Sequence, residues 1–152
     1  MKLAEALVTR AHSQRRLAQL KQRLMQSAQV QEGEQPAEPP HELLEEYEVV
    51  AIELERLIRQ INQTNMQTTL DSGETLTEVL AARDVLRMRM LLYRDLAESA
   101  TVSHERYSRS EVKLVSTVNV RSIRKQADAL SKAYRDLDAR IQAVNWQTEL
   151  RT

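Results

Sequence analysis

Several residue types that particular chemistries require are missing or scarce in this sequence. Cys is absent from the 152 residues, which excludes disulfides and thiolate metal ligands. Only two Gly occur, and neither belongs to a Gly-rich phosphate-binding loop. Of the three His, only His41 has an acidic residue at helical ligand spacing, Glu38, and both lie in a proline-rich loop. We therefore expect no metal and no cofactor.

An excess of one charge sign and long apolar runs are also missing. The 22 basic and 22 acidic residues give a formal net charge of zero, so no global field favours nucleic acid or an anionic membrane. The N-terminal stretch MKLAEALVTRAHSQRR is too polar for a signal peptide or a membrane-spanning helix. We therefore expect a cytoplasmic protein with no membrane or nucleic-acid partner.

Catalytic motifs are absent as well. The sequence has no nucleophile elbow and no convincing catalytic triad. His104 lies near Ser108 and Ser110, but polar loops supply such neighbours routinely. We therefore expect that the protein is not an enzyme.

The abundant residues are Ala, Leu, Glu, Gln and Arg, a composition typical of long packed helices. Apolar residues at three- and four-residue steps predict helices over about 3–30, 41–67, 75–100 and 119–148. Thr75 and Glu78 form a capping box at the start of the third helix, and Asn119 is the predicted N-cap of the fourth.

One short strand is predicted at 112–118, because the apolar period there changes from helical to alternating. A small β-turn segment is expected near 69–75, and it is the only intrachain candidate to pair with the strand. If it does not, the open strand edge pairs with a copy of itself, and a homo-oligomer follows. Apolar residues beside the helical seams, such as Ile52 and Ile58, point the same way.

The second and fourth helices carry the same coiled-coil-like seam, 80 positions apart. The seam of the second helix is Leu43, Tyr47, Val50, Leu54, Leu57, Ile61 and Thr64. The seam of the fourth is Ile123, Ala127, Leu130, Tyr134, Leu137, Ile141 and Val144. The first and third helices match at an offset of 73, because LAEALVTR at residue 3 and LTEVLAAR at residue 76 both read L-x-E-x-L-x-x-R. The sequence therefore indicates an internal duplication.

These patterns together predict one all-α domain over 1–152. We expect an antiparallel four-helix bundle built from two duplicated helical hairpins, residues 1–68 and 75–150, with a strand before the last helix.

A polar cluster is expected at one end of each hairpin, where the start of its first helix lies beside the end of its second. The first cluster consists of Glu5, Arg10, Asn65 and Gln67, and the second of Glu78, Arg83, Asn145 and Gln147. An inward-facing Arg must be paired there, because an unpaired buried charge is costly. Three interpretations stay open: a structural polar lock, a pocket for a small polar ligand, and a self-association surface. Trp146 and Met66 share one repeat position, where a Trp is typically a packing anchor.

Basic residues gather before and within the start of the fourth helix. They are Arg106, Arg109, Lys113, Arg121, Arg124 and Lys125. Cations near a helix N-terminus need something negative nearby. We expect the acidic face of the second helix, from this chain or a second copy, or else a small anion such as a phosphate-bearing ligand.

A resemblance to a known family is carried by the segments MKLAEAL, VQEGEQPAE, RYSRSEVK and NWQTEL. Over nearly its whole length, the chain resembles the uncharacterised bacterial family often named septicolysin. This resemblance implies a small all-helical cytoplasmic protein, and the family name suggests a lytic toxin. The residues themselves argue against lysis, because no interfacial apolar helix is present. We expect a non-enzymatic, homo-oligomeric structural or interaction protein. The alternatives are a binder of a small polar ligand or anion and a membrane-active lytic protein.

Overall fold

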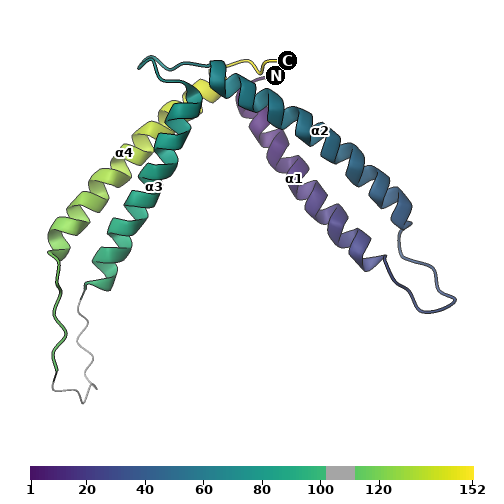
Figure 1. The fold of residues 1–152 in the computed structure, drawn as a ribbon, viewed down its shortest axis with the longest axis horizontal. Helices are drawn as coiled ribbons and strands as arrows, with labels where there is room; N and C mark the ends of the chain where they lie inside the picture. The colour runs from purple at the N-terminus through teal and green to yellow at the C-terminus, as the bar shows by residue number, and fades with distance from the viewer. Residues whose placement is uncertain (102–111) are drawn as a thin grey trace. The chain divides into compact units, whose positions relative to one another are not determined.

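The regular structure of the chain is helical (Figure 1). The computed structural model describes residues 1–101 and 112–152. Its helices are α1 (Leu3–Gln26), α2 (Pro40–Gln67), α3 (Leu76–Ser99) and α4 (Val120–Gln147). The predicted class, an all-α four-helix bundle, is confirmed. The chain divides into two compact units. The first unit is Met1–Leu76 together with Gln142–Thr152, and the second unit is Thr77–Ile141.

The helix bounds repeat the offsets found in the sequence. α1 and α3 have 24 residues each, and both bounds of α3 lie 73 positions after those of α1. α2 and α4 have 28 residues each, and both bounds of α4 lie 80 positions after those of α2. The extra residues of the second half therefore belong to the connection between α3 and α4. Residues related by these offsets are called equivalent below.

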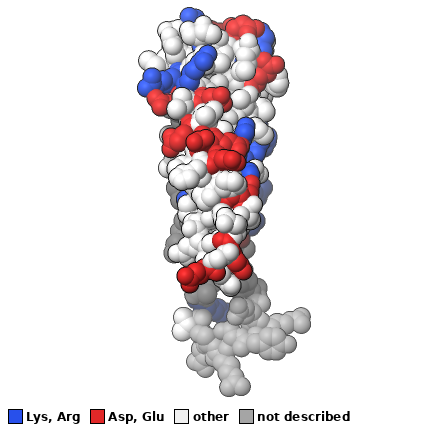
Figure 2. All heavy atoms as spheres, turned by 90° about the vertical axis from the view of Figure 1, so that its right-hand side faces the viewer, with Lys and Arg blue, Asp and Glu red and all other residues white. Residues whose placement is uncertain are grey.

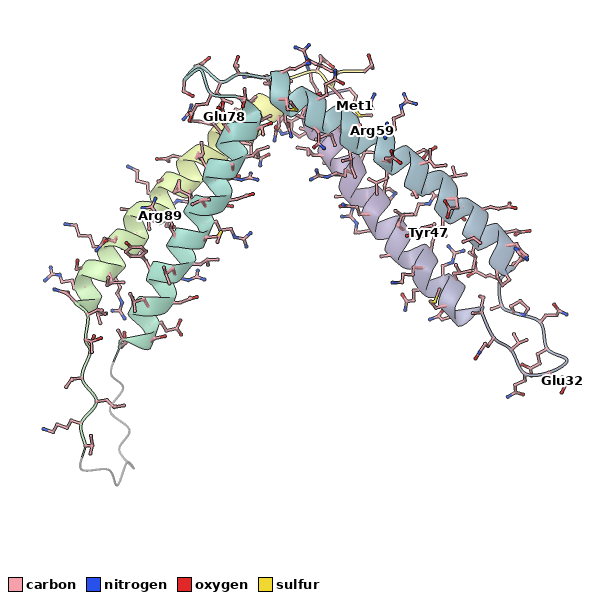
Figure 3. The ribbon with its side chains drawn as sticks, viewed as in Figure 1. Met1, Glu32, Tyr47, Arg59, Glu78 and Arg89 are labelled. Atoms are coloured by element: carbon pink, nitrogen blue, oxygen red, sulfur yellow. The ribbon has the colours of Figure 1, made fainter. Side chains whose placement is uncertain are left out.

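The core of the first unit lies between α1 and α2. One cluster of this core consists of Leu20, Leu43 and Val50, which are buried. Leu17, Leu24 and Tyr47 pack against them. Tyr47, labelled in Figure 3, belongs to α2 and lies on its side toward α1. Burial of these side chains is the main favourable contribution to pairing the two helices.

Burial confirms both predicted seams. All seven seam positions of α2 and all seven of α4 are buried or half-buried. The facing positions of α1 are also buried or half-buried, and they are Leu3, Ala6, Arg10, Ser13, Leu17, Leu20 and Leu24. Their equivalents on α3, from Leu76 to Ala97, follow the same pattern. The steps of three and four residues are those of coiled-coil packing.

In the first unit, the chain before α1 runs antiparallel to the chain after α4. The Leu3 N–H donates to the Thr148 carbonyl at 2.9 Å, and the Leu150 N–H donates to the Met1 carbonyl at 2.8 Å. These bonds make Lys2 and Glu149 an isolated β-bridge. They also satisfy an N–H in the first turn of α1 that has no intrahelical acceptor.

The chain before α3 repeats this arrangement with the chain after α2. The Leu76 N–H donates to the Thr68 carbonyl at 2.8 Å, and the Leu70 N–H donates to the Glu74 carbonyl at 2.8 Å. Thr69 and Thr75 form the equivalent β-bridge, which confirms the β-turn segment predicted near 69–75. The starts of α1 and α3 therefore each bond to the chain after the second helix of the other hairpin, rather than to the end of their own partner helix.

The strand predicted at 112–118 is wrong. The segment is irregular, and Val112, Leu114 and Val115 are 77–80% exposed. Alternating apolar residues form a strand only where a second strand supplies hydrogen-bond partners. No such partner occurs among residues 1–101 and 112–152, because the 69–75 segment bridges to itself.

The predicted helix starts are confirmed. α3 begins at Leu76, directly after Thr75. The Asn119 Oδ1 accepts the Ser122 N–H at 3.0 Å, so Asn119 caps α4 through its side chain.

An ion pair reinforces the terminal β-bridge. The Lys2 Nζ lies 2.6 Å from a Glu149 carboxylate oxygen and also donates to the Gln147 carbonyl at 3.2 Å. The hydrogen bond from Lys2 holds the pKa of Glu149 below its ordinary value. Both side chains are well exposed, so the contribution of this pair to stability is small.

This lowered pKa predicts how acid affects stability. A carboxyl whose pKa is lower in the folded state stabilises it above the unfolded-state pKa, and that stabilisation is lost as pH falls through the folded value. We expect the wild-type protein to melt a few degrees at most above Glu149→Gln at pH 7, and the two melting temperatures to converge below the ordinary carboxyl pKa of 4.5. Melting curves by circular dichroism from pH 7 to pH 3 measure this. A difference that grows on acidification would contradict it.

Candidate functional site

The first predicted polar cluster lies in the first unit, but its members are not bonded to one another. The Glu5 carboxylate accepts the Lys2 N–H at 2.7 Å and so caps the first turn of α1. Arg10 and Asn65 are half-buried, and Gln67 is exposed. No hydrogen bond or ion pair joins these four side chains in the part of the chain that the structure describes.

The polar contact at this end is made by Thr64 instead. Its side chain is fully buried on the α2 seam. The Oγ1 donates to the Gln60 carbonyl at 2.7 Å and accepts the Arg151 N–H at 3.0 Å. The end of α2 therefore contacts the chain after α4 through this seam residue. Thr64 is a seam position in the sequence pattern, and that pattern alone does not mark it as a polar contact.

The second predicted cluster is divided between the two units. Glu78 and Arg83 belong to the second unit, whereas Asn145 and Gln147 belong to the first. Asn145 is buried, with 4% of its surface exposed, and Gln147 contributes only its carbonyl, to Lys2. Arg83 is half-buried on the α3 seam, and its guanidinium pairs with an acidic side chain of α4.

That partner is Asp138 of α4, which is not one of the predicted cluster residues. The Arg83 Nη1 donates to the Asp138 Oδ1 at 2.8 Å, and the two side chains are 23% and 34% exposed. Asp138 directly follows the seam residue Leu137 and reaches Arg83 from the flank of the seam. The equivalents of this pair are Arg10 and Ile58, so the first unit keeps the Arg without the acid.

The predicted basic stretch is described only in part. Arg106 and Arg109 lie outside the described residues. Lys113, Arg121, Arg124 and Lys125 are exposed. Arg124 donates to the Thr101 Oγ1 at 3.1 Å, which joins the start of α4 to the end of α3. An open cavity of about 560 Å³ lies beside this contact, and Arg94, Ala97 and Ala127 contribute to its wall.

The acidic face expected to meet this stretch lies on α2. Acidic side chains gather on the face shown in Figure 2, which views the side of Figure 1 where α2 lies. The exposed glutamates of α2 are Glu42, Glu45, Glu48, Glu53 and Glu55. Glu46 pairs with Arg16 of α1 at 2.7 Å, and Glu55 pairs with Arg59 at 2.7 Å. Part of this charge is therefore neutralised within the first unit.

Exposed apolar side chains form a stripe on α3 that is not among the predicted sites. We call it the α3 stripe. It consists of Val85, Met88, Leu92 and Leu96, with 54%, 69%, 64% and 38% of their surfaces exposed. The steps of three and four residues along α3 are the sequence signal for this stripe, but the same steps also mark a buried seam, so the pattern alone does not show which face is exposed. Trp146 is 59% exposed and Met66 is 67% exposed, so the expectation that Trp146 is a packing anchor is wrong.

Residues 1–101 and 112–152 contain neither a metal-ligand cluster nor a membrane-spanning helix. No group of three or more His, Cys, Asp or Glu side chains is placed to hold a metal ion there. None of the described helices is both long and apolar enough to cross a bilayer.

The Arg83–Asp138 pair predicts a measurable coupling. Arg83→Leu leaves Asp138 without its partner and should lower the free energy of unfolding by about 1–2 kcal/mol, below the 3–5 kcal/mol of a fully buried pair because solvent reaches both groups. The double variant with Asp138→Leu should recover about half of that loss. Arg10→Leu is the matched control, and we expect a change below about 0.5 kcal/mol. Urea denaturation measures all four values, and equal losses for Arg83→Leu and Arg10→Leu would contradict the coupling.

Comparisons with known proteins place the chain among proteins of unknown function. A crystal structure of a functionally unknown conserved protein from Corynebacterium diphtheriae is 50% identical, matches over 99% of both chains and superposes with a TM-score of 0.94. No curated protein matches the chain. Neither result bears on the resemblance to the septicolysin family, which stays a prediction. A model of a family of unknown function, DUF6847, matches residues 10–150, and the chain therefore belongs to this family.

Proposed function

We propose that this protein is a non-enzymatic, homo-oligomeric interaction protein that associates through the outer face of α3. The observation that supports this proposal is the α3 stripe. Three of its four side chains have more than half of their surfaces exposed. Single exposed apolar residues are common on proteins, but a contiguous apolar face typically marks an interaction surface.

The α3 stripe lies on one side of its helix. An α-helix turns by about 100° per residue, so steps of three, four and four residues keep Val85, Met88, Leu92 and Leu96 within about a quarter turn. The seam residues Arg83, Met90 and Ala97 lie on the opposite side, where α3 packs against α4. Pairing with α4 therefore cannot cover the stripe.

The equivalent face of α1 shows that the fold does not require an apolar stripe. Its residues are His12, Arg15, Gln19 and Arg23. All four are exposed and polar. α1 and α3 have the same length and the same pattern of buried positions. The difference between their outer faces is therefore not explained by the requirements of folding.

A second copy of this chain is the occupant that the surrounding charges favour. On the helical wheel, one edge of the stripe carries Asp84 and Asp95, and the other edge carries Arg89. In a parallel two-fold pair of helices, unlike edges meet, as in a parallel coiled coil. Arg89 of each copy then lies opposite the acidic edge of the other. Two-fold symmetry also places the stripe in the interface twice, which removes eight apolar side chains from water.

Substitution at the centre of the stripe tests this association. We expect the wild-type protein to sediment as a dimer or larger oligomer at micromolar concentration. Leu92→Glu should shift it to monomer, because the stripe would then have to bury a carboxylate. The equivalent substitution Gln19→Glu on α1 is the matched control and should leave the oligomer intact. Analytical ultracentrifugation and light scattering measure the mass.

Charge reversal at the edge of the stripe tests the parallel arrangement. Arg89→Glu places like charges opposite each other in a parallel pair and should weaken association at least tenfold at low salt. Asp95→Arg in the same chain should restore part of that loss. A wild-type protein that stays monomeric at high concentration, or a Leu92→Glu variant that stays oligomeric, would overturn the proposal.

A further inference from the structure

The cavity between α3 and α4 is a place where the second unit departs from the first. In the first unit, Leu24 and Tyr47 occupy the seam and pack against the buried cluster around Leu20. Their equivalents in the second unit are Ala97 and Ala127. Both are buried, with 3% and 9% of their surfaces exposed. A leucine and a tyrosine side chain are thus each replaced by a methyl group, and an open cavity of about 560 Å³ lies above them.

Charged side chains form the rim of this cavity. Arg94 and Glu98 come from α3, and Arg124 and Asp128 come from α4. Arg124 is held by its hydrogen bond to Thr101. In the first unit, the equivalents of Arg94 and Arg124 are Lys21 and Leu44, so the pair of arginines is also particular to the second unit.

A second hollow of about 560 Å³ adjoins the first along α4. Arg124 and Asp128 line both, and Arg121 and Lys125 line only the second. The two hollows together present four cations and two carboxylates. The first cavity by itself is balanced, with two cations and two carboxylates, and Arg121 and Lys125 of the adjoining hollow add the positive charge that favours a negative ligand.

We propose that this cavity binds a small organic anion. Its apolar body, about the size of one aromatic ring, occupies the space above Ala97 and Ala127 that Leu24 and Tyr47 fill in the first unit. Its carboxylate or phosphate accepts hydrogen bonds from the guanidinium groups of Arg94 and Arg124, whose planar donor geometry suits both anions. Small-molecule sites combine an apolar wall with a few polar groups in this way. The site is independent of the association proposed for α3.

Small aromatic anions test whether the cavity binds such a ligand. Phenyl phosphate and benzoate serve as probes, phenol represents the ring alone, and inorganic phosphate represents the anion alone. We expect saturable binding of phenyl phosphate, benzoate or both in titrations followed by ¹H–¹⁵N NMR and calorimetry, with shifts confined to residues 94–101 and 120–128. Their relative affinities separate a phosphate ligand from a carboxylate ligand. Inorganic phosphate and phenol should bind at least tenfold more weakly than the better probe.

Two variants separate the cavity from the charge. Ala127→Tyr fills the cavity with the side chain of the equivalent position and should weaken binding at least tenfold. Arg124→Gln leaves the cavity open and should have a similar effect, so a folding defect in Ala127→Tyr would not leave the proposal untested. Arg15→Gln, an exposed arginine of α1, is the control that should bind as the wild type does. The proposal is overturned if neither probe binds saturably, if inorganic phosphate binds as tightly as phenyl phosphate, or if both variants bind like the wild type.

Discussion

The apolar seam between two helices is the constraint on which the rest of this structure depends. A hairpin of two helices can bury only one face of each helix, so α1 and α2 commit Leu20, Leu43 and Val50 to a single line of contact. The remaining faces need a polar surface or a further partner. α1 has a polar surface opposite its seam, whereas α3 has apolar residues opposite its seam. Building each unit from two helices therefore leaves the outer face of α3 uncovered, but it does not require that face to be apolar.

The period of the seam is also why so much of the fold could be predicted. Ile61 and Ile141 are fully buried where the 80-residue repeat placed them, and the helix bounds follow the same offsets. The position of the buried face is local information, because apolar residues at steps of three and four mark it within each helix. The capping role of Asn119 was predictable for the same reason, since an N-cap acts on its own first turn.

Contacts between segments far apart in the chain were not predictable in this way. The periodicity of α1 does not specify whether the Leu3 N–H meets Thr68 or Thr148, because the two residues are equivalent in sequence. The seam pattern does not identify Asp138 as the partner of Arg83, because Asp138 lies beside the seam rather than on it. The strand at 112–118 failed for a related reason. Alternating apolar residues predict which face of a sheet each side chain occupies. The interstrand hydrogen bonds that make the sheet depend on a partner strand.

The repeated helical hairpin provides a control within the molecule for judging which features serve folding alone. Exchanging a well-packed Leu for Ala typically costs about 2–5 kcal/mol, yet the second unit has Ala97 where the first has Leu24. The second unit also has Asp138 where the first unit has Ile58. An ion pair therefore replaces an apolar side chain at a position where the first unit folds with the apolar one. The first unit shows that the same helices pair with larger apolar residues at these positions. Proteins depart from good packing chiefly at functional sites, so the departures direct the search for function to the second unit, to α3 and the start of α4.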